Sequence, residues 1–191
     1  HYYNIEITQK NDDNVITSIE FNGDQITFDS NYEATIPVLY ADDTATFTIN
    51  AVDSYATKYI NSLAPSGSYN LAVGDNVYRI WLVSEAGTKG IEYKVTVERG
   101  AADTEVGIEN LKILSGTTNL LDGIVPNVSG TTTTYELRVD RAVSLTAITY
   151  DLKSNVATAS ENWSNLNLTA GGTKTFTITV TAEDTSVKHY Y

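Results

Sequence analysis

Residues 176–182 read Phe-Thr-Ile-Thr-Val-Thr-Ala, so apolar and threonine side chains alternate at every position. Successive side chains of a strand point to opposite faces, and this alternation therefore predicts a strand with one buried and one solvated face. Residues 44–51 follow the same rule, with Ala, Phe, Ile and Ala at every second position. The abundant Thr, Val, Ile and Tyr favour strands, and no stretch of the sequence has a helical period. The sequence predicts an all-β protein.

The strand at 176–182 belongs to an internal repeat. Tyr78 and Phe176 stand 98 positions apart, and the same offset carries Tyr93 onto Tyr191. Short strands separated by Asn-Gly, Pro-Ser-Gly and Gly-Gly turns indicate two tandem β-sandwiches of about 90 to 100 residues each.

Weaker correspondences lie upstream of these tyrosines. The pairs that we assign are 19–23 with 111–116, 36–40 with 135–139, Asp53 with Asp151, and Ala56-Thr57 with Ala157-Thr158. The polar segments 9–14 and 99–104 are the expected linkers. We therefore divide the chain into three parts. These are a terminal strand at 1–10 that belongs to a preceding sandwich, a first sandwich at 11–101, and a second at 102–191 that lacks its last strand.

A repeated tripeptide is the basis for this missing strand. Residues 1–3, His-Tyr-Tyr, recur as residues 189–191, and the equivalent tyrosine in the middle of the chain runs into the alternating strand 94–98. The sequence ends where the second copy of that strand is due, and a strand of the same pattern stands at the front. A sheet with an unpaired edge presents free backbone donors and acceptors to another chain. The residues that we assign to this head-to-tail strand are Tyr3, Ile5 and Ile7.

Three arrangements could complete the second sandwich. Residues 3–8 could fold back, a neighbouring copy could insert its own, or the chain could continue covalently into another copy. The chain usually enters an Ig-like sandwich at one end and leaves it at the other. This disfavours folding back and predicts a head-to-tail contact that extends into a filament. The repeated tripeptide favours a covalent array, because a donor strand has no need to repeat residues that its acceptor already has.

Composition limits the partners. The chain has 191 residues, with 12 basic and 24 acidic side chains and a formal net charge of -12, which argues against nucleic acid and anionic membrane surfaces. Without cysteine, disulfides and thiolate metal sites are excluded, and no run approaches the roughly 20 apolar residues of a membrane span. The chain begins with His rather than Met, which suggests a piece of a longer polypeptide. We expect other copies of the same chain as its partners.

The pattern resembles the cadherin-like β-sandwich module that is common in bacterial surface proteins. The residues that carry the resemblance are Pro126, Tyr135-x-Leu137-x-Val139, Asp151…Ala157-Thr158, Leu168-x-x-Gly171, Phe176 to Asp184, and the closing strands Tyr93 to Val97 and Tyr3 to Ile7. The resemblance implies an extracellular, non-enzymatic spacer or adhesion module at the bacterial cell surface.

The sequence offers little chemistry. The histidines, His1 and His189, both flank strands rather than form part of a triad, and no phosphate-binding glycine loop is present. We expect neither an enzyme nor a cofactor. The candidate calcium ligands are Asp12, Asp13, Asp103 and Glu105, which lie near the two linkers. Calcium takes six to eight oxygen ligands, so capping of turns is the favoured interpretation of these four residues.

One strand departs from the rule that outward side chains are polar. Val77, Trp81 and Val83 lie on the face opposite Tyr78 and Ile80. They form a candidate contact surface, either for lateral packing or for a ligand, unless a neighbouring loop covers them. We therefore expect a structural repeat unit of a bacterial extracellular fibre, joined by strand complementation or by covalent repetition. The alternative is a surface adhesin module that binds carbohydrate or a host protein.

Overall fold

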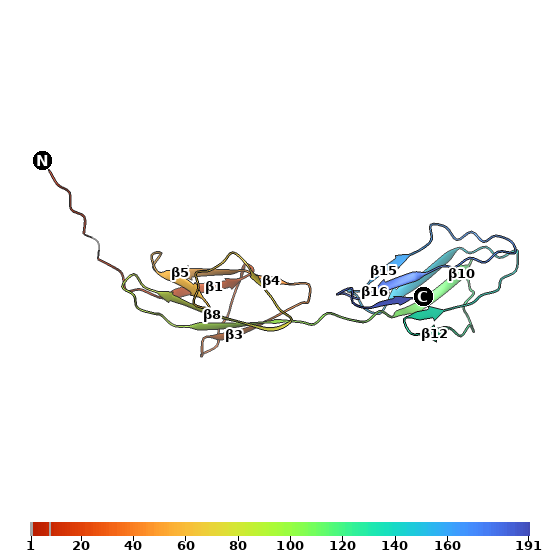
Figure 1. Cartoon of the computed structure of the whole chain (residues 1–191), viewed down its shortest axis with the longest axis horizontal. Helices are drawn as coiled ribbons and strands as arrows, with labels where there is room; N and C mark the ends of the chain where they lie inside the picture. Colours follow the sequence, from red (N-terminus) through yellow and green to blue (C-terminus); the bar gives the residue numbers. More distant parts are fainter. Residues whose placement is uncertain (1, 8) are drawn as a thin grey trace. The chain divides into compact units, whose positions relative to one another are not determined.

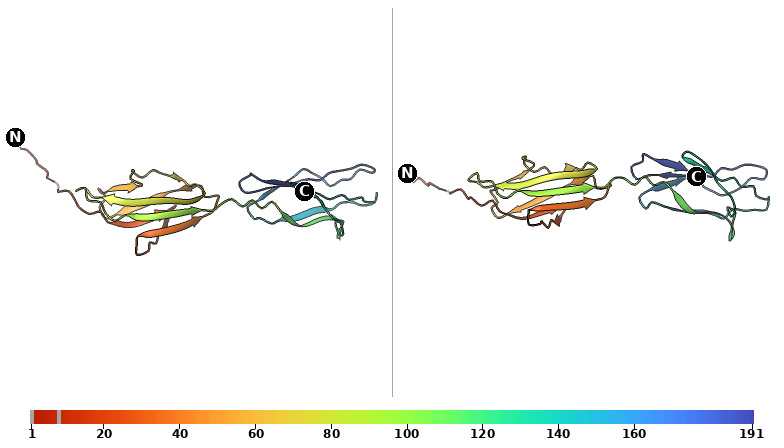
Figure 2. Two further views of the ribbon diagram at one scale, coloured as in Figure 1. Left: turned by 60° about the horizontal axis from the view of Figure 1, so that its bottom comes forward. Right: turned by 90° about the horizontal axis from the view of Figure 1, so that it is seen from below.

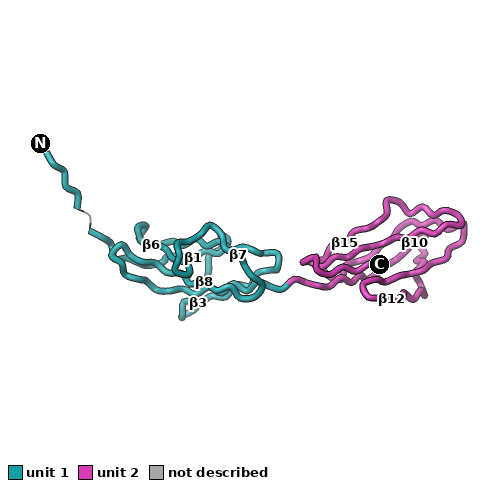
Figure 3. The backbone as a smooth tube through the Cα atoms, viewed as in Figure 1, with its two compact units in different colours: residues 1–101 teal, residues 102–191 magenta. Residues whose placement is uncertain are grey.

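The computed structural model describes residues 2–7 and 9–191, and the chain falls into two compact units, residues 1–101 and 102–191 (Figure 3). All regular secondary structure among the described residues is β-strand, so the predicted all-β class is confirmed (Figure 1). Each unit is a β-sandwich.

Unit 1 consists of two main sheets and a short pair of strands. The first sheet has the order β2 (Asp24–Gln25), β1 (Ile16–Phe21) and β5 (Phe47–Ala51); the second has the order β3 (Glu33–Val38), β9 (Tyr93–Arg99), β8 (Gly74–Val83) and β6 (Thr57–Ile60); the pair is β4 (Thr44–Ala45) with β7 (Tyr69–Asn70). Strand β9 runs parallel to β3 and antiparallel to β8, and the three lie side by side in Figure 2.

The core of unit 1 follows from the alternation of its strands. Every second residue of β8 from Tyr78 to Leu82 is buried, while Arg79 between them is exposed. From the facing sheet, Ile19 and Ile49 stand opposite each other in the ladder of β1 and β5, and both are buried. The predicted alternation of residues 44–51 is confirmed, because their apolar side chains are buried or half-buried and their polar ones exposed.

Unit 2 also has two sheets. One has the order β11 (Thr118–Asn119), β10 (Ile108–Ser115) and β14 (Ala147–Leu152); the other has the order β12 (Asn127–Ser129), β13 (Thr132–Thr134), β17 (Lys188–Tyr190), β16 (Ile178–Thr181) and β15 (Thr158–Glu161). Strand β17 lies between a parallel neighbour, β13, and an antiparallel one, β16, as β9 does in unit 1. It has three residues, whereas β9 has seven.

One predicted correspondence is wrong. Asp151 lies in β14, where its carboxylate accepts a hydrogen bond from Asn110 at 2.8 Å. The residue that takes the place of Asp53 is Ser154, since each precedes the buried alanine of its unit by three positions and each side chain caps the turn between them. A carboxylate and a hydroxyl can accept the same backbone hydrogen bonds, so different residues cap the equivalent turns of the two units.

Candidate assembly site

The last rung of the unit 2 ladder has a counterpart in unit 1. Ile178 and Tyr191 exchange both backbone hydrogen bonds, each 2.8 Å long. The pair 98 positions earlier, Ile80 and Tyr93, is the first rung between β8 and β9, and that ladder continues to Gly74 opposite Arg99. Unit 2 thus contains the beginning of this ladder, in the register that the sequence offset predicts.

Two segments of unit 2 border the position where the ladder would continue. Residues 172–177 precede β16 and residues 135–139 follow β13, and neither segment has strand structure. In unit 1, the corresponding parts of β8 and β3 pair with β9 from both sides. Among the described residues, no backbone hydrogen bond engages Lys174 or Phe176. We call these two segments the acceptor edges.

The core beneath the acceptor edges is less covered than its counterpart. In unit 1, Val95 and Val97 of β9 are fully buried, and the pair Ile19 and Ile49 of the opposite sheet is 1% and 3% exposed. The equivalent ladder pair in unit 2, Ile113 and Ile148, is only half-buried, as is Phe176, whereas its counterpart Tyr78 is buried. In unit 1, the inward side chains of Val95 and Val97 cover the corresponding part of the core. The described residues of unit 2 include no strand at that position, so its side chains there stay half-buried.

Residues 2–7 form no strand in the structure, and their apolar side chains are in solvent. Tyr3, Ile5 and Ile7 are 85%, 83% and 89% exposed. Residues 1 and 8 of the predicted terminal strand lie outside the described residues. Complete burial of one such isoleucine side chain stabilises a protein by about 1.5–3 kcal/mol. Burial of this segment against another surface would therefore favour association by several kcal/mol.

The last residues of unit 2 are held in place. The Tyr191 hydroxyl donates to the carbonyl of Val106 at 3.0 Å, and burial raises the pKa of this tyrosine above its ordinary value. The Nε2 atom of His189 lies 2.9 Å from Oγ1 of Thr133, so the histidine joins β17 to β13. Residues 189–191 are therefore part of the native sheet.

The candidate calcium ligands of unit 1 lie in turns. Asp13 Oδ1 accepts the backbone N–H of Val15 at 3.0 Å, and Asp12 Oδ1 accepts the Ser84 hydroxyl at 2.8 Å. Hydrogen bonds from the side chains of Thr88 and Ser84 lower the pKa of Asp12.

The candidates of unit 2 have similar partners. Asp103 Oδ1 accepts the N–H of Glu105 at 2.9 Å, and Glu105 Oε1 accepts the N–H of Gly107. Hydrogen bonds from the side chain of Ser154 and the backbone of Glu105 lower the pKa of Asp103. In residues 2–7 and 9–191, no group of three or more His, Cys, Asp or Glu side chains is placed to hold a metal ion.

The candidate contact surface around Trp81 is partly covered by its neighbours. Val77 is exposed, whereas Trp81 and Val83 are half-buried. Tyr59 of β6 stacks on Trp81, with ring centroids 5.7 Å apart and planes at 12°, and the Lys89 ammonium lies 4.1 Å from the indole centroid. Because β6 and the segment of Lys89 pair with opposite sides of β8, the indole is approached from both sides.

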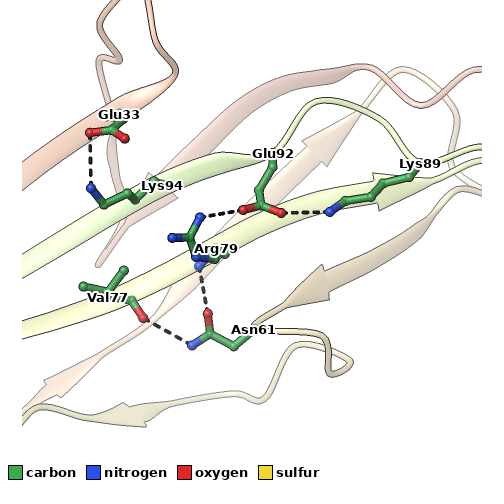
Figure 4. A network of polar contacts seen from close by, with 7 residues as sticks. All are labelled: Glu33, Asn61, Val77, Arg79, Lys89, Glu92 and Lys94. Carbon is green, nitrogen blue, oxygen red and sulfur yellow. Dashed lines mark hydrogen bonds and ion pairs between the residues drawn. The ribbon is translucent and has the colours of Figure 1, made fainter.

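Charged side chains surround this surface. Glu92 pairs with Arg79 at 2.7 Å and with Lys89 at 2.8 Å, and Lys94 pairs with Glu33 at 3.2 Å (Figure 4). The hydrogen bonds from Lys89 and Arg79 lower the pKa of Glu92. Exposed ion pairs of this kind are worth about 0–1 kcal/mol each, so they orient Lys89 more than they stabilise the unit.

Sequence reasoning missed one pair of equivalent asparagines. Asn61 Oδ1 accepts the backbone N–H of Arg79 at 2.8 Å, as Figure 4 shows, and Asn162 Oδ1 accepts that of Thr177 at the same distance. Arg79 and Thr177 stand 98 positions apart, so the edge that faces β6 or β15 is formed alike in both units. The signal is short, a single asparagine after each of two strands, and similar asparagines are frequent in this sequence.

The sequence of unit 1 matches that of a known β-sandwich family. Residues 16–100 match the family model of the cadherin-like beta sandwich domain. No curated protein and no solved structure matches the chain significantly. The described residues include no helix with the length and hydropathy that crossing a bilayer requires. Cadherin-like domains are typically extracellular and serve as structural or adhesion modules at surfaces. The match spans β1 to β9, so the strands of unit 1 have the sequence pattern of a cadherin-like β-sandwich.

Proposed function

We propose that this chain is a structural repeat unit of a bacterial extracellular or cell-surface fibre, in which successive copies are joined head to tail. The observation that carries the proposal is the pair of acceptor edges in unit 2, which border an uncovered core, together with the exposed strand-like segment at residues 3–7. A strand that enters between the edges gains main-chain hydrogen bonds on both sides and buries its inward side chains. The function needs neither a catalytic group nor a cofactor.

Two routes would produce such a fibre. In one, residues 3–7 of a separate copy pair with the acceptor edges; in the other, a polypeptide continues after Tyr191 into a further repeat. Both place the same pattern of side chains in the same ladder, so both make the same main-chain hydrogen bonds at the joint. The mass of the polypeptide in the native material distinguishes them, since one copy has a mass of 20.8 kDa and a continuous array has a multiple of the repeat.

Electron microscopy of the native material tests the fibre itself. We expect unbranched filaments whose length increases with protein concentration if the copies are separate. Monodisperse monomers at high concentration, with unit 2 folded, would refute the proposal. A disordered unit 2 in the isolated chain, as measured by amide hydrogen exchange, would instead support the need for a further strand.

The adhesin alternative depends on the surface around Trp81. A sugar ring stacks on an exposed aromatic face, but Tyr59 and Lys89 both contact this indole. The geometry therefore favours the fibre over a carbohydrate platform at this position. A glycan screen with Trp81→Ala as its control tests the alternative: binding that the substitution abolishes would establish the adhesin.

A further inference from the structure

We infer that residues 4–7 of a second copy insert between the acceptor edges of unit 2, with Ile5 and Ile7 in the positions that Val95 and Val97 hold in unit 1. The inference rests on the proposed function and takes the first of its two routes, the separate copy, although the repeated tripeptide alone favours the covalent array. It names both the partner segment and its register. Residues 189–191 of the acceptor already occupy the three preceding positions of the ladder, so the donor enters the sheet at Asn4.

The antiparallel edge fixes the register of the donor. Tyr191 stands opposite Ile178, and Tyr3 has the same place in the repeat as Tyr191. Continuing the ladder places Ile5 opposite Phe176 and Ile7 opposite Lys174. Residues opposite each other in antiparallel strands alternate between hydrogen-bonded and non-hydrogen-bonded pairs. The pair of Ile178 and Tyr191 is hydrogen-bonded, so the pairs at Phe176 and Lys174 are hydrogen-bonded as well.

The existing hydrogen bonds of unit 2 agree with this phase. The backbones of Lys174, Thr175 and Phe176 have no hydrogen-bond partner among the described residues, so the two positions that must bond to the donor are available. Thr177 lies between Phe176 and Ile178, and both its backbone N–H and its carbonyl are bonded to Asn162 on the opposite side. A donor shifted by one residue would have to bond to Thr177, whose backbone groups are already used.

The parallel edge requires the same register. The N–H of Tyr190 donates to the carbonyl of Thr131 at 2.8 Å, and Tyr190 stands beside Thr132. Hydrogen bonds to a parallel neighbour come from every second residue, which here are the residues that do not bond to β16. Asn4 and Glu6 then bond to the edge at 135–139, while Ile5 and Ile7 bond to the other edge.

The side chains of the donor suit this position. Period-two alternation turns Ile5 and Ile7 to the same face as Tyr191, which is the face of the core. There they meet half-buried apolar side chains, among them Ile113, Ile148 and Phe176. Isoleucine is β-branched like the two valines of unit 1 and larger by one methylene, so it fills a core that contains fewer buried side chains.

Disulfide trapping tests the register, and the chain has no cysteine of its own. Glu6 and Thr175 stand opposite each other as a non-hydrogen-bonded pair, the closest pairing in an antiparallel ladder. Both side chains are exposed. We expect the double variant E6C/T175C to form a ladder of disulfide-linked oligomers under mild oxidation. The matched variant E6C/T177C, displaced by two residues on the same face, is expected to give at least tenfold less.

A chain that carries a second copy of the sequence Asn4 to Gln9 after Tyr191 is the control for the source of the strand. The fused segment occupies the acceptor edges within its own chain, so cross-linking of its E6C/T175C version should fall at least tenfold. Equal cross-linking at both registers, no cross-linking, or no effect of the fusion overturns the inference. If filaments are seen by electron microscopy in any of these cases, the fibre function stands and only the donor or its register is wrong.

Discussion

The backbones of Ile178 and Tyr191 are joined by two hydrogen bonds of 2.8 Å, one in each direction. This rung fixes the phase of everything that can follow it in the sheet, because alternate residues of a strand bond to alternate neighbours. It also places the Tyr191 side chain on the core side of unit 2, where the tyrosine packs against the cluster of Ile178 and Val180. A strand that continues from this point must therefore present apolar residues at its second and fourth positions.

Replacement of Ile5 and Ile7 by aspartate should prevent assembly. Each substitution removes an apolar side chain worth about 1.5–3 kcal/mol on burial and would place an unpaired carboxylate in the core of the acceptor. We expect association of the double variant to weaken by roughly a hundredfold or more, as measured by sedimentation velocity. The unfolding of unit 1 should not change, since both side chains are exposed in the structure.

Glu6→Gln is the matched control for this pair, because Glu6 has the opposite orientation in the same segment. It should assemble as the unmodified chain does. Equal loss of assembly in both variants would contradict the inward placement of the isoleucines, because Glu6→Gln changes only an outward side chain.

Asp53→Ser should stabilise unit 1. Asp53 is buried and uses Oδ1 to cap the N–H of Tyr55, while its Oδ2 has no hydrogen-bond partner among the described residues. Ser154 caps the equivalent turn with one oxygen. An unsatisfied buried polar atom costs about 1–3 kcal/mol, so we expect the free energy of unfolding to increase by about 1 kcal/mol in denaturant titrations. Asp53→Ala, which loses the cap as well, should show no such gain.

Asn61 should tolerate glycine better than alanine. Its φ is 51°, in the left-handed region, and its side chain accepts the N–H of Arg79. Asn61→Gly loses this hydrogen bond and the one that Asn61 donates to the Val77 carbonyl, at about 0.5–1.5 kcal/mol each, and Asn61→Ala adds about 1 kcal/mol of backbone strain. Thermal unfolding of the two variants separates these contributions. Equal loss in both would mean that the backbone angle is not constrained at this position.

Acid should destabilise unit 1 through Asp12. Hydrogen bonds from Thr88 and Ser84 hold the folded pKa of Asp12 below its ordinary value of 3.8. Its contribution to stability is thus fully present above that ordinary value and is lost as pH falls through the folded pKa. Ser84→Ala should raise the pKa of Asp12 toward 3.8 in an NMR titration of its carboxyl carbon. The pKa of Asp103 in unit 2 should stay unchanged.

Much of the fold could be predicted because alternation and local repetition carry it. The alternation of residues 44–51 follows from the period of a strand, and the structure has it. The equivalent pairing of Tyr93 with Ile80 and of Tyr191 with Ile178 follows from one sequence offset, and the structure has this as well. The residue of unit 2 that corresponds to Asp53 was predicted wrongly, because residue types were matched and not the capping of the turn. Serine and aspartate serve the same turn, and the spacing to the following alanine is what the two units share.

The surroundings of the candidate residues could not be predicted, because they depend on distant parts of the chain. Ser84 reaches Asp12 across 72 positions, and the stacking of Tyr59 on Trp81 follows from the register of β6 against β8. Strand pairing of this kind is set by turns and packing together, and a shift of one residue would turn Tyr59 to the other face.

The entry of each unit is tied to one turn. The Asn11 N–H donates to Glu85 Oε2 and its carbonyl accepts from Ala86, while Asp103 exchanges the same two kinds of bond with Glu183. In unit 1 this turn leads into β9, which pairs with neighbours on both sides along its whole length before the chain leaves at Gly100. A pull on the two ends of this unit therefore loads the rungs on both sides of β9 in shear, all at once, rather than peeling them apart one by one. Resistance to extension is thus a property of the strand order itself.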